Sequence, residues 1–280
     1  MVLLADAALA LAAPVLAAPP DVRGRSFVVE NGATGEVLLA RDARERVPIA
    51  SITKLMTVLL TLERAKPSDV VVVSPFAADV GESSANLRAG ERLTVRELLE
   101  AALIQSANDA ADALAFYVGR GNEQRFVALM NARARKLGLR DTHFVRPDGL
   151  DAPGHVSSAR DVTLLARIVM HRPLVRQIVR MRSATISGGE TLHTWNDLLS
   201  TYPGVFGVKT GHTSAAGWSQ VAAARRRGVT VYATLLGSPA RDTRNADLSA
   251  LLTWGLARKA VVGNGRHGHA YRGLYCPIGA

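Results

Sequence analysis

Residues 48–54 read Pro-Ile-Ala-Ser-Ile-Thr-Lys, and apolar residues continue from there at helical spacing as far as Leu62. A proline suits the first position of a helix, so this pattern predicts an amphipathic helix that begins at Pro48. Residues three apart on a helix lie on one face, which places the hydroxyl of Ser51 beside the amine of Lys54. The stretch therefore predicts a serine nucleophile next to a lysine base.

The chemistry of this pair depends on its surroundings. A serine hydroxyl is a weak nucleophile until a base removes its proton. Lysine can be that base when burial or a second cation lowers the pKa of its amine. Backbone N–H groups in the first turn of a helix lack helical partners, so those near Ser51 can stabilise an oxyanion. Ser-x-x-Lys alone is a weak signal, because roughly a third of shuffled chains of this composition would contain it by chance.

A second motif, Lys209-Thr210-Gly211, follows the turn Tyr202-Pro203-Gly204 and precedes a predicted strand. A lysine and a hydroxyl at a strand edge can bind a carboxylate, and Gly211 would let a substrate backbone approach closely. Val208 stands before Lys209, so this is not the Gly-Lys-Thr run of a phosphate loop. We therefore interpret the motif as a carboxylate site.

A third motif, Ser106-Ala107-Asn108, has a competitor of the same spelling, Ser84-Ala85-Asn86. We favour Ser106 because it joins two predicted helices, whereas Ser84 lies in a polar turn. The Ser106 hydroxyl can relay a proton to a leaving amine, and the Asn108 amide can hold both Lys54 and a substrate.

Strand signals occur at both ends of the chain, and helix signals fill the middle. Residues 26–30 and 36–40 flank a turn cluster and predict a hairpin, and residues 218–224 and 229–236 predict a second strand pair. This order predicts an α+β fold, an antiparallel β-sheet flanked by helices with a central helical insertion. The other predicted elements are a short strand at 70–73, a helix capped by Thr94 and Glu97, and helices at about 108–118, 126–137, 161–170 and 248–256.

The composition and net charge of the chain indicate which binding partners and stabilising groups to expect. The chain has 280 residues, a formal net charge of +10 and 48% hydrophobic residues, so its core needs no metal or disulfide. The single cysteine, Cys276, cannot close an internal disulfide. No short Lys/Arg block alternates with aromatic residues, and Arg225-Arg226-Arg227 before Gly228 is typical of a hairpin turn, so no nucleic-acid partner is expected. The charge fits an anionic envelope polymer or a solvated basic surface.

The N-terminal sequence predicts export. Residues 9–18 are apolar, and Val15-Leu16-Ala17 resembles the small-residue cleavage site of a secretory signal, which makes residues 1–20 a partial signal segment. Asp6 stands where such signals carry a basic residue. No other stretch approaches 18 continuous apolar residues, so no internal membrane span is predicted.

The three motifs occur in the order Ser-x-x-Lys, Ser-x-Asn, Lys-Thr-Gly, and in this respect the chain resembles the D-alanyl-D-alanine carboxypeptidases, the low-mass penicillin-binding proteins. The resemblance runs from about residue 27 to residue 254 and implies a β-lactamase/transpeptidase-like fold. It implies a catalytic domain at residues 21–261 and a C-terminal tail at 262–280. Residues beside the motifs also resemble the family: Pro48-Ile49-Ala50, Asp109-Ala110-Ala111, Gly149-Leu150-Asp151, Ser158-Ala159-Arg160-Asp161 and His212 to Gly217.

The resemblance also implies a role for each motif residue. Ser51 would attack the D-Ala-D-Ala carbonyl and form an acyl-enzyme, Lys54 would be the base, and Ser106 would shuttle protons. The backbone N–H groups of Ser51 and His212 would form the oxyanion hole. An arginine would help to hold the substrate carboxylate, and its place before the last helix favours Arg244 over Arg241. The implied substrate-binding residues are Asn108, Lys209, Thr210, Gly211, His212, Thr213 and Arg244.

The partners implied are the peptidoglycan stem peptide and, as covalent inhibitors, β-lactams. We expect an extracytoplasmic monomer that uses no cofactor and no metal, although His267 and His269 in the tail are a weak metal signal. Many members of the family continue into a β-rich domain and a C-terminal amphipathic anchor. Neither pattern occurs in residues 262–280, so the sequence leaves membrane attachment open.

Three alternatives remain from sequence. A class A-like β-lactamase needs a carboxylate that activates water, and the candidates are Glu123 and Glu190, neither of which has an asparagine four residues later. A non-catalytic penicillin-binding sensor would keep the same motifs without turnover. An esterase or peptidase of the same fold with another substrate is the third, because pocket shape sets specificity.

Overall fold

A computed structural model describes residues 18–262, with side chains described as far as Arg258. Most of the predicted signal segment and nearly all of the predicted tail lie outside the described residues. So do Cys276, His267 and His269. The predictions made for these parts of the chain therefore stay predictions.

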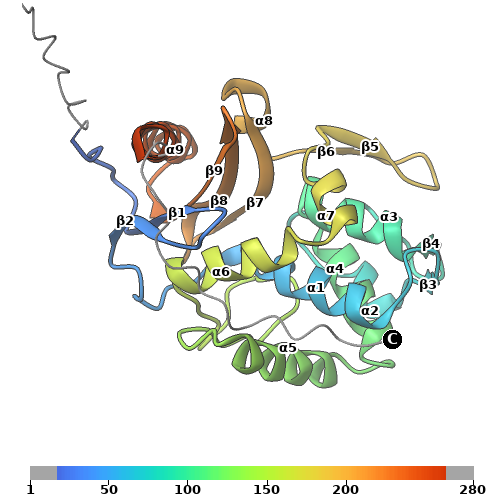
Figure 1. The fold of residues 1–280 in the computed structure, drawn as a ribbon. Helices are drawn as coiled ribbons and strands as arrows, with labels where there is room; N and C mark the ends of the chain where they lie inside the picture. The colour runs from blue at the N-terminus through green and yellow to red at the C-terminus, as the bar shows by residue number, and fades with distance from the viewer. Residues whose placement is uncertain (1–17, 263–280) are drawn as a thin grey trace, which may run out of the picture.

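The centre of the fold is a five-stranded antiparallel sheet with the strand order β2-β1-β9-β8-β7 (Figure 1). Its strands come from both ends of the chain, which confirms the predicted α+β class. Strand β7 lies at the edge of the sheet, so one side of its backbone is not paired within the sheet. The strands are β1 (Ser26–Asn31), β2 (Val37–Arg41), β7 (Val205–Thr213), β8 (Gly217–Arg226) and β9 (Val229–Ser238).

Helices cover both faces of this sheet (Figure 1). On one face, α9 (Arg241–Val262) packs Leu248, Leu251 and Leu252 against sheet residues that include Val29. On the other face, α6 (Ala159–Val169) lies between the sheet and α1 (Lys54–Arg64), and these elements enclose the larger core. The other helices are α2 (Pro75–Ala78), α3 (Val95–Glu100), α4 (Asn108–Val118), α5 (Glu123–Leu137), α7 (Pro173–Ile178) and α8 (Leu198–Thr201).

The structure contains the predicted helix cap of α3 and also two small sheets that were not predicted. The predicted capping box at the start of α3 is confirmed, because the Thr94 hydroxyl accepts from the N–H of Glu97 and the Glu97 carboxylate accepts from the N–H of Thr94. Two small two-stranded sheets were not predicted as pairs, because strands of three residues are too short to show alternation. They consist of β3 (Val70–Val72) with β4 (Arg92–Thr94) and of β5 (Ser183–Thr185) with β6 (Thr191–His193).

The helix predicted to begin at Pro48 begins later, and that prediction is wrong. Ala50 has a left-handed φ of 48°, and a 3₁₀ turn, η1 (Ala50–Thr53), precedes α1. The proline ring sets only its own φ, so it cannot impose helical geometry on Ala50 two residues later. Ser51 therefore lies in a tight turn before the helix, and Lys54 is the first residue of α1.

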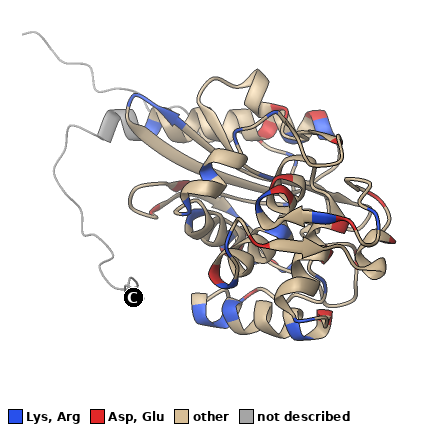
Figure 2. Ribbon diagram, turned by 90° about the vertical axis from the view of Figure 1, so that its right-hand side faces the viewer, with Lys and Arg blue, Asp and Glu red and all other residues tan. Residues whose placement is uncertain are grey.

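Charge is spread widely over the described residues. Figure 2 shows acidic and basic residues interspersed over the ribbon, with basic residues along α5 at the bottom of the view. None of the helices within residues 18–262 is long and apolar enough to cross a bilayer.

Candidate active site

The turn that carries Ser51 is held by two glycines distant in sequence. Gly149 has a φ of +89°, and a Cβ at this position would overlap the carbonyl oxygen of Ala50. A Cβ on Gly211 would stand 2.8 Å from the carbonyl oxygen of Ile49. Both glycines allow neighbouring chain to press against the turn, and a left-handed φ at the non-glycine Ala50 is sustained by such contacts.

Lys54 lies directly beside the nucleophile. Its side chain is fully buried, and its Nζ lies 2.8 Å from Ser51 Oγ, 2.7 Å from Asn108 Oδ1 and 2.6 Å from the carbonyl oxygen of Asp148. Burial lowers the pKa of Lys54 to about 8, against the opposing effect of nearby carboxylates, of which Asp148 is the strongest. The amine therefore exists partly in its neutral form near physiological pH.

The three partners of Lys54 determine where its lone pair points once the proton is lost. Neutral lysine keeps two N–H bonds and one lone pair. The carbonyl of Asp148 can only accept, and Asn108 Oδ1 must also accept, because Nδ2 of the same amide donates to the carbonyl of Gly81 at 3.0 Å. The Ser51 hydroxyl is the one partner of the three that can donate. Neutral Lys54 therefore turns its lone pair toward the hydroxyl proton of Ser51, which is the geometry of a general base.

Ser106 faces the same cluster from the opposite side. It follows a π-helical turn, η2 (Ala101–Gln105), and has a left-handed φ of 67° that points the chain back into α4. Lys209 Nζ, 2% exposed as a residue, donates to Ser106 Oγ at 2.8 Å and to the carbonyl of Thr210 at 2.8 Å. Burial, then Lys54 and Arg244, lower the pKa of Lys209 well below its usual range. Two buried lysines and two serine hydroxyls thus form one site.

The competing Ser-x-Asn sequence at Ser84 has a structural place beside this site. The carboxylate of Asp109 accepts from the Ser84 hydroxyl at 2.6 Å and from the backbone N–H groups of Ala85 and Leu87. Asp109 follows Asn108 at the start of α4. The turn at Ser84 is therefore hydrogen-bonded to the same helix that carries Asn108, the partner of Lys54.

The predicted carboxylate residues lie around the edge strand. Thr210 is opposite Gln220 in the register of β7 and β8, on the strand face that α9 covers, and its hydroxyl has no hydrogen-bond partner among the described side chains and backbone. Arg244 on α9 is buried, with its guanidinium 5.8 Å from the ring of Trp218 and close enough to affect the pKa of Lys209. Arg241 is instead half-buried on the outer side and pairs with Asp197. The structure thus brings Arg244, rather than Arg241, to the side of Lys209.

Three other predicted substrate residues are held by contacts within the protein. The Thr213 hydroxyl donates to Asp151 at 2.6 Å and accepts from the N–H of Ala216. His212 stacks on Trp218 with the ring centroids 4.0 Å apart, so its ring is already in contact with a side chain of the neighbouring strand. The missing side chain of Gly211 gives space to the Ser51 turn, where the sequence analysis expected a substrate backbone.

The residues that set the environment of Lys54 belong to none of the three sequence motifs. Asp148 is fully buried, offers its carbonyl to Lys54, and binds Arg146 through both carboxylate oxygens. Only the turn spelling Pro147-Asp148-Gly149 marks it in the sequence. His155, also outside these motifs, accepts from two backbone N–H groups at Nδ1, contacts the Thr53 hydroxyl at Nε2, and has a pKa lowered by burial to about 4.

Glu123 and Glu190, the candidate carboxylates for the β-lactamase alternative, are not among the residues that contact Lys54. Glu190 accepts from the side chain of Asn86 at 3.0 Å, and Glu123 begins α5 and lines a surface cavity with Arg146. No group of three or more His, Cys, Asp and Glu side chains suited to a metal ion occurs within the described part of the chain.

The chain is similar to several known proteins over most of its length. A family model described as D-alanyl-D-alanine carboxypeptidase matches residues 13–240. The D-alanyl-D-alanine carboxypeptidase DacF of Bacillus subtilis is 35% identical over 243 residues, 84% of this chain and 62% of the relative. DacD of Escherichia coli is 37% identical over 250 residues, 85% of this chain and 64% of the relative. The DD-transpeptidase of Streptomyces K15 superposes with a TM-score of 0.82 at 31% identity, over 86% of this chain and all of that chain.

Proposed function

The chain belongs to the D-alanyl-D-alanine carboxypeptidase family, and from this premise we propose that it is a serine D-alanyl-D-alanine carboxypeptidase that removes the terminal D-Ala of peptidoglycan pentapeptides and is inhibited by penicillin. The chain spans less than two thirds of the length of the two curated relatives described above. The activity is therefore argued from the site of this chain. The observation that carries it is the contact between Lys54 Nζ and Ser51 Oγ at 2.8 Å, with a lone pair that has no other place to point.

In the proposed reaction, Ser51 Oγ attacks the carbonyl carbon between the last two D-Ala residues while Lys54 takes the hydroxyl proton. The resulting oxyanion is stabilised by backbone N–H groups, for which those of Ser51 and His212 stay our prediction. The C–N bond then breaks, and the proton that Lys54 took is passed through the Ser106 hydroxyl, which Lys209 contacts, to the leaving amine, so that Lys54 is neutral again. In the second half, water attacks the acyl ester while Lys54 takes its proton, and Lys54 returns that proton to Ser51 Oγ as the shortened peptide leaves.

Substrate binding is proposed to centre on the terminal carboxylate. Thr210 follows Lys209 on β7, and Arg244 on α9 is close enough to lower the pKa of Lys209, so the three residues offer two basic groups and a free hydroxyl. A carboxylate that enters there favours the charged form of Lys209, whose pKa is otherwise lowered by burial. Charged Lys209 therefore forms together with the bound carboxylate, which favours free acids over neutral peptides.

The proposed function is tested by D-alanine release and by the mass of the intact protein. We expect the purified protein to liberate D-alanine from a peptide that ends in D-Ala-D-Ala, and to gain the mass of one penicillin on Ser51. Rapid turnover of penicillin without a persistent adduct would instead favour the β-lactamase alternative. Acylation without D-alanine release would favour the sensor.

A second candidate is transfer of the acyl group to an amine instead of water, because the chain is similar over 86% of its length to a protein named DD-transpeptidase. The same assay run with an added D-amino acid distinguishes the two outcomes. Hydrolysis gives only the shortened peptide, whereas transfer gives an exchanged peptide of different mass.

Lys209→Ala is expected to lower kcat/KM for a peptide with a free terminal carboxylate by roughly ten- to a hundredfold, the loss of one charge-assisted hydrogen bond. A neutral ester of the same acyl group should lose much less. The exposed Lys66, changed to alanine, removes the same charge and should leave both rates unchanged. An equal loss on acid and ester would count against the carboxylate role of Lys209.

The location and domain boundaries follow from the same proposal. The peptidoglycan substrate lies outside the cytoplasmic membrane, so we propose an exported protein whose catalytic domain comprises residues 21–261. The monomeric state and the mode of membrane attachment stay predictions.

A further inference from the structure

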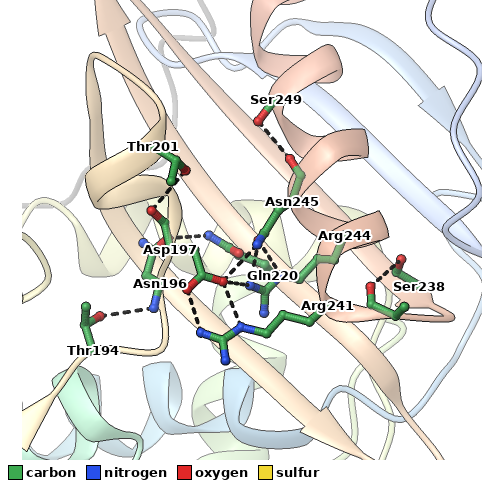
Figure 3. Close-up of polar contacts among 11 residues, drawn as sticks. Thr194, Asn196, Asp197, Thr201, Gln220, Ser238, Arg241, Arg244, Asn245 and Ser249 are labelled. Atoms are coloured by element: carbon green, nitrogen blue, oxygen red, sulfur yellow. Dashed lines mark hydrogen bonds and ion pairs between the residues drawn. The ribbon is translucent and has the colours of Figure 1, made fainter.

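Asp197 connects Arg241 and Arg244 at the start of α9 and is assigned no role by the reaction above. It precedes α8, and its carboxylate accepts from Arg241 at 2.5 and 2.8 Å, from Arg244 at 3.2 Å and from the Asn245 amide at 2.8 Å (Figure 3). The side chain of Arg241 is 34% exposed, that of Asp197 is 28% exposed, and that of Arg244 is 1% exposed. The carboxylate therefore lies between an outer arginine and a buried one.

The loop that carries Asp197 is attached directly behind the carboxylate site. Gln220 Nε2 donates to Asn196 Oδ1 at 2.8 Å, and both side chains are buried. Gln220 is opposite Thr210 in the β7–β8 register, so the residue before Asp197 is attached to the strand position next to the proposed substrate hydroxyl. Arg241 fixes the carboxylate from outside and lies 5.2 Å from the ring of Trp195. Asp197 is thus positioned from both sides.

The contacts of Arg244 use only part of its guanidinium. Nε donates to Asn245 Oδ1 at 3.1 Å, and Nη2 donates to Asn245 Oδ1 at 2.6 Å and to Asp197. Nη1 has no hydrogen-bond partner among the described residues. A planar guanidinium held along its Nε and Nη2 edge has a fixed plane, and its remaining nitrogen stays available to a ligand.

The electrostatic balance supports the same role. Arg244 has a basic neighbour on each side, Arg241 outside and Lys209 within the site, and burial lowers the pKa of Arg244 to about 10 while Asp197 opposes that shift. A buried cation without a partner is strongly destabilised. Asp197 therefore keeps Arg244 both charged and in place before any substrate arrives.

We propose that Asp197 is a positioning residue for carboxylate recognition, which holds Arg244 so that its Nη1 can bind the terminal carboxylate beside Lys209 and Thr210. The proposal rests on the proposed function, because it assumes that the substrate carboxylate binds at this place. Asp197 touches Arg244 and not the substrate, so its effect should appear only with ligands that carry the carboxylate.

The test compares acylation of Ser51 by benzylpenicillin and by its methyl ester, which differ only in the charge of the carboxyl group. Asp197→Asn keeps the size of the side chain and removes the charge. We expect it to slow acylation by the acid by about tenfold, the effect of roughly one displaced charge-assisted bond, and to leave acylation by the ester unchanged. The matched control is Asp42→Asn, which removes one charge from an exposed residue after β2 whose left-handed φ of 46° asparagine also tolerates. It should leave both rates unchanged.

Two further variants separate positioning from general damage to the fold. Asn245→Ala removes the other acceptor of Arg244 and should produce the same selective loss, so the proposal stays testable if Asp197→Asn folds poorly. In an Arg244→Ala background, Asp197→Asn should slow the acid no further, because its partner is gone. Equal slowing of acid and ester, additive losses in the double variant, or faster acylation by the acid would each overturn the proposal. Absence of acylation in the unaltered protein would instead overturn the proposed function, and the role of Asp197 with it.

Discussion

Replacing Ser51 with alanine is expected to abolish both D-alanine release and covalent labelling by penicillin. The substitution removes the atom that forms the acyl bond in the proposed reaction, and it leaves the contacts of Lys54 to Asn108 and to the Asp148 carbonyl in place. Residual catalysis by the remaining site does not include an acyl-enzyme, so the rate should fall by about 10⁴-fold or more. The measurement is mass spectrometry of the intact protein after penicillin treatment, together with D-alanine release.

The control for this variant is Ser68→Ala, an exposed serine in the turn before β3. It should be acylated as fast as the unaltered protein. Ser51→Ala should keep its thermal unfolding midpoint within a few degrees, because the change removes one partly buried hydrogen bond of about 1 kcal/mol. A penicillin adduct that persists in Ser51→Ala, mapped to Ser106 or elsewhere, would show that the nucleophile assignment is wrong.

The order of motifs along the chain could be predicted from sequence, and so could the sheet. Continuous apolar runs mark β8 and β9 clearly, because these strands are buried on both faces of the sheet. The Thr94 capping box and the bounds of α4 depend on neighbours in sequence, and both were predicted correctly. Such features can be predicted because the hydrogen bonds that form them join residues only a few positions apart in the sequence.

The start of α1 could not be predicted, because its cause lies far away in the sequence. Gly149 and Gly211 come from other parts of the chain and press on the turn at Ala50, which is held in a left-handed conformation. The sequence of residues 48–54 gives no indication that Gly149 and Gly211 contact this turn. Tertiary packing therefore overrides the helix signal of Pro48 and places Ser51 in a 3₁₀ turn.

The polar residues that orient Lys54 and Arg244 could not be predicted from sequence patterns either. Asp148 acts on Lys54 through its backbone carbonyl, an atom that every residue type carries. Asp197 reaches Arg244 only because the loop after β6 folds over the start of α9. Motif spelling identifies the groups that react, whereas the groups that orient them are determined by the fold.

Removing the base is expected to have an effect nearly as large as removing the nucleophile. Lys54→Ala should slow acylation by roughly 10³- to 10⁴-fold, at the upper end of what general base catalysis contributes. It leaves Asn108 Oδ1 and the Asp148 carbonyl without the donor they share, so a lower unfolding midpoint should accompany the loss. Lys54→Arg is the matched control, since arginine keeps the positive charge but does not lose its proton in proteins.

The pH profile distinguishes a base from a mere cation. The neutral form of Lys54 is the active one, and its pKa is about 8, so the second-order acylation rate should rise about tenfold per pH unit below that value and level off above it. If Lys54 acted only through its charge, the rate would instead fall as the pH passed 8, and Lys54→Arg would retain activity. Because the amine is buried and its two other partners can only accept, the lone pair must face Ser51, and both lysine variants should lose the rising limb together.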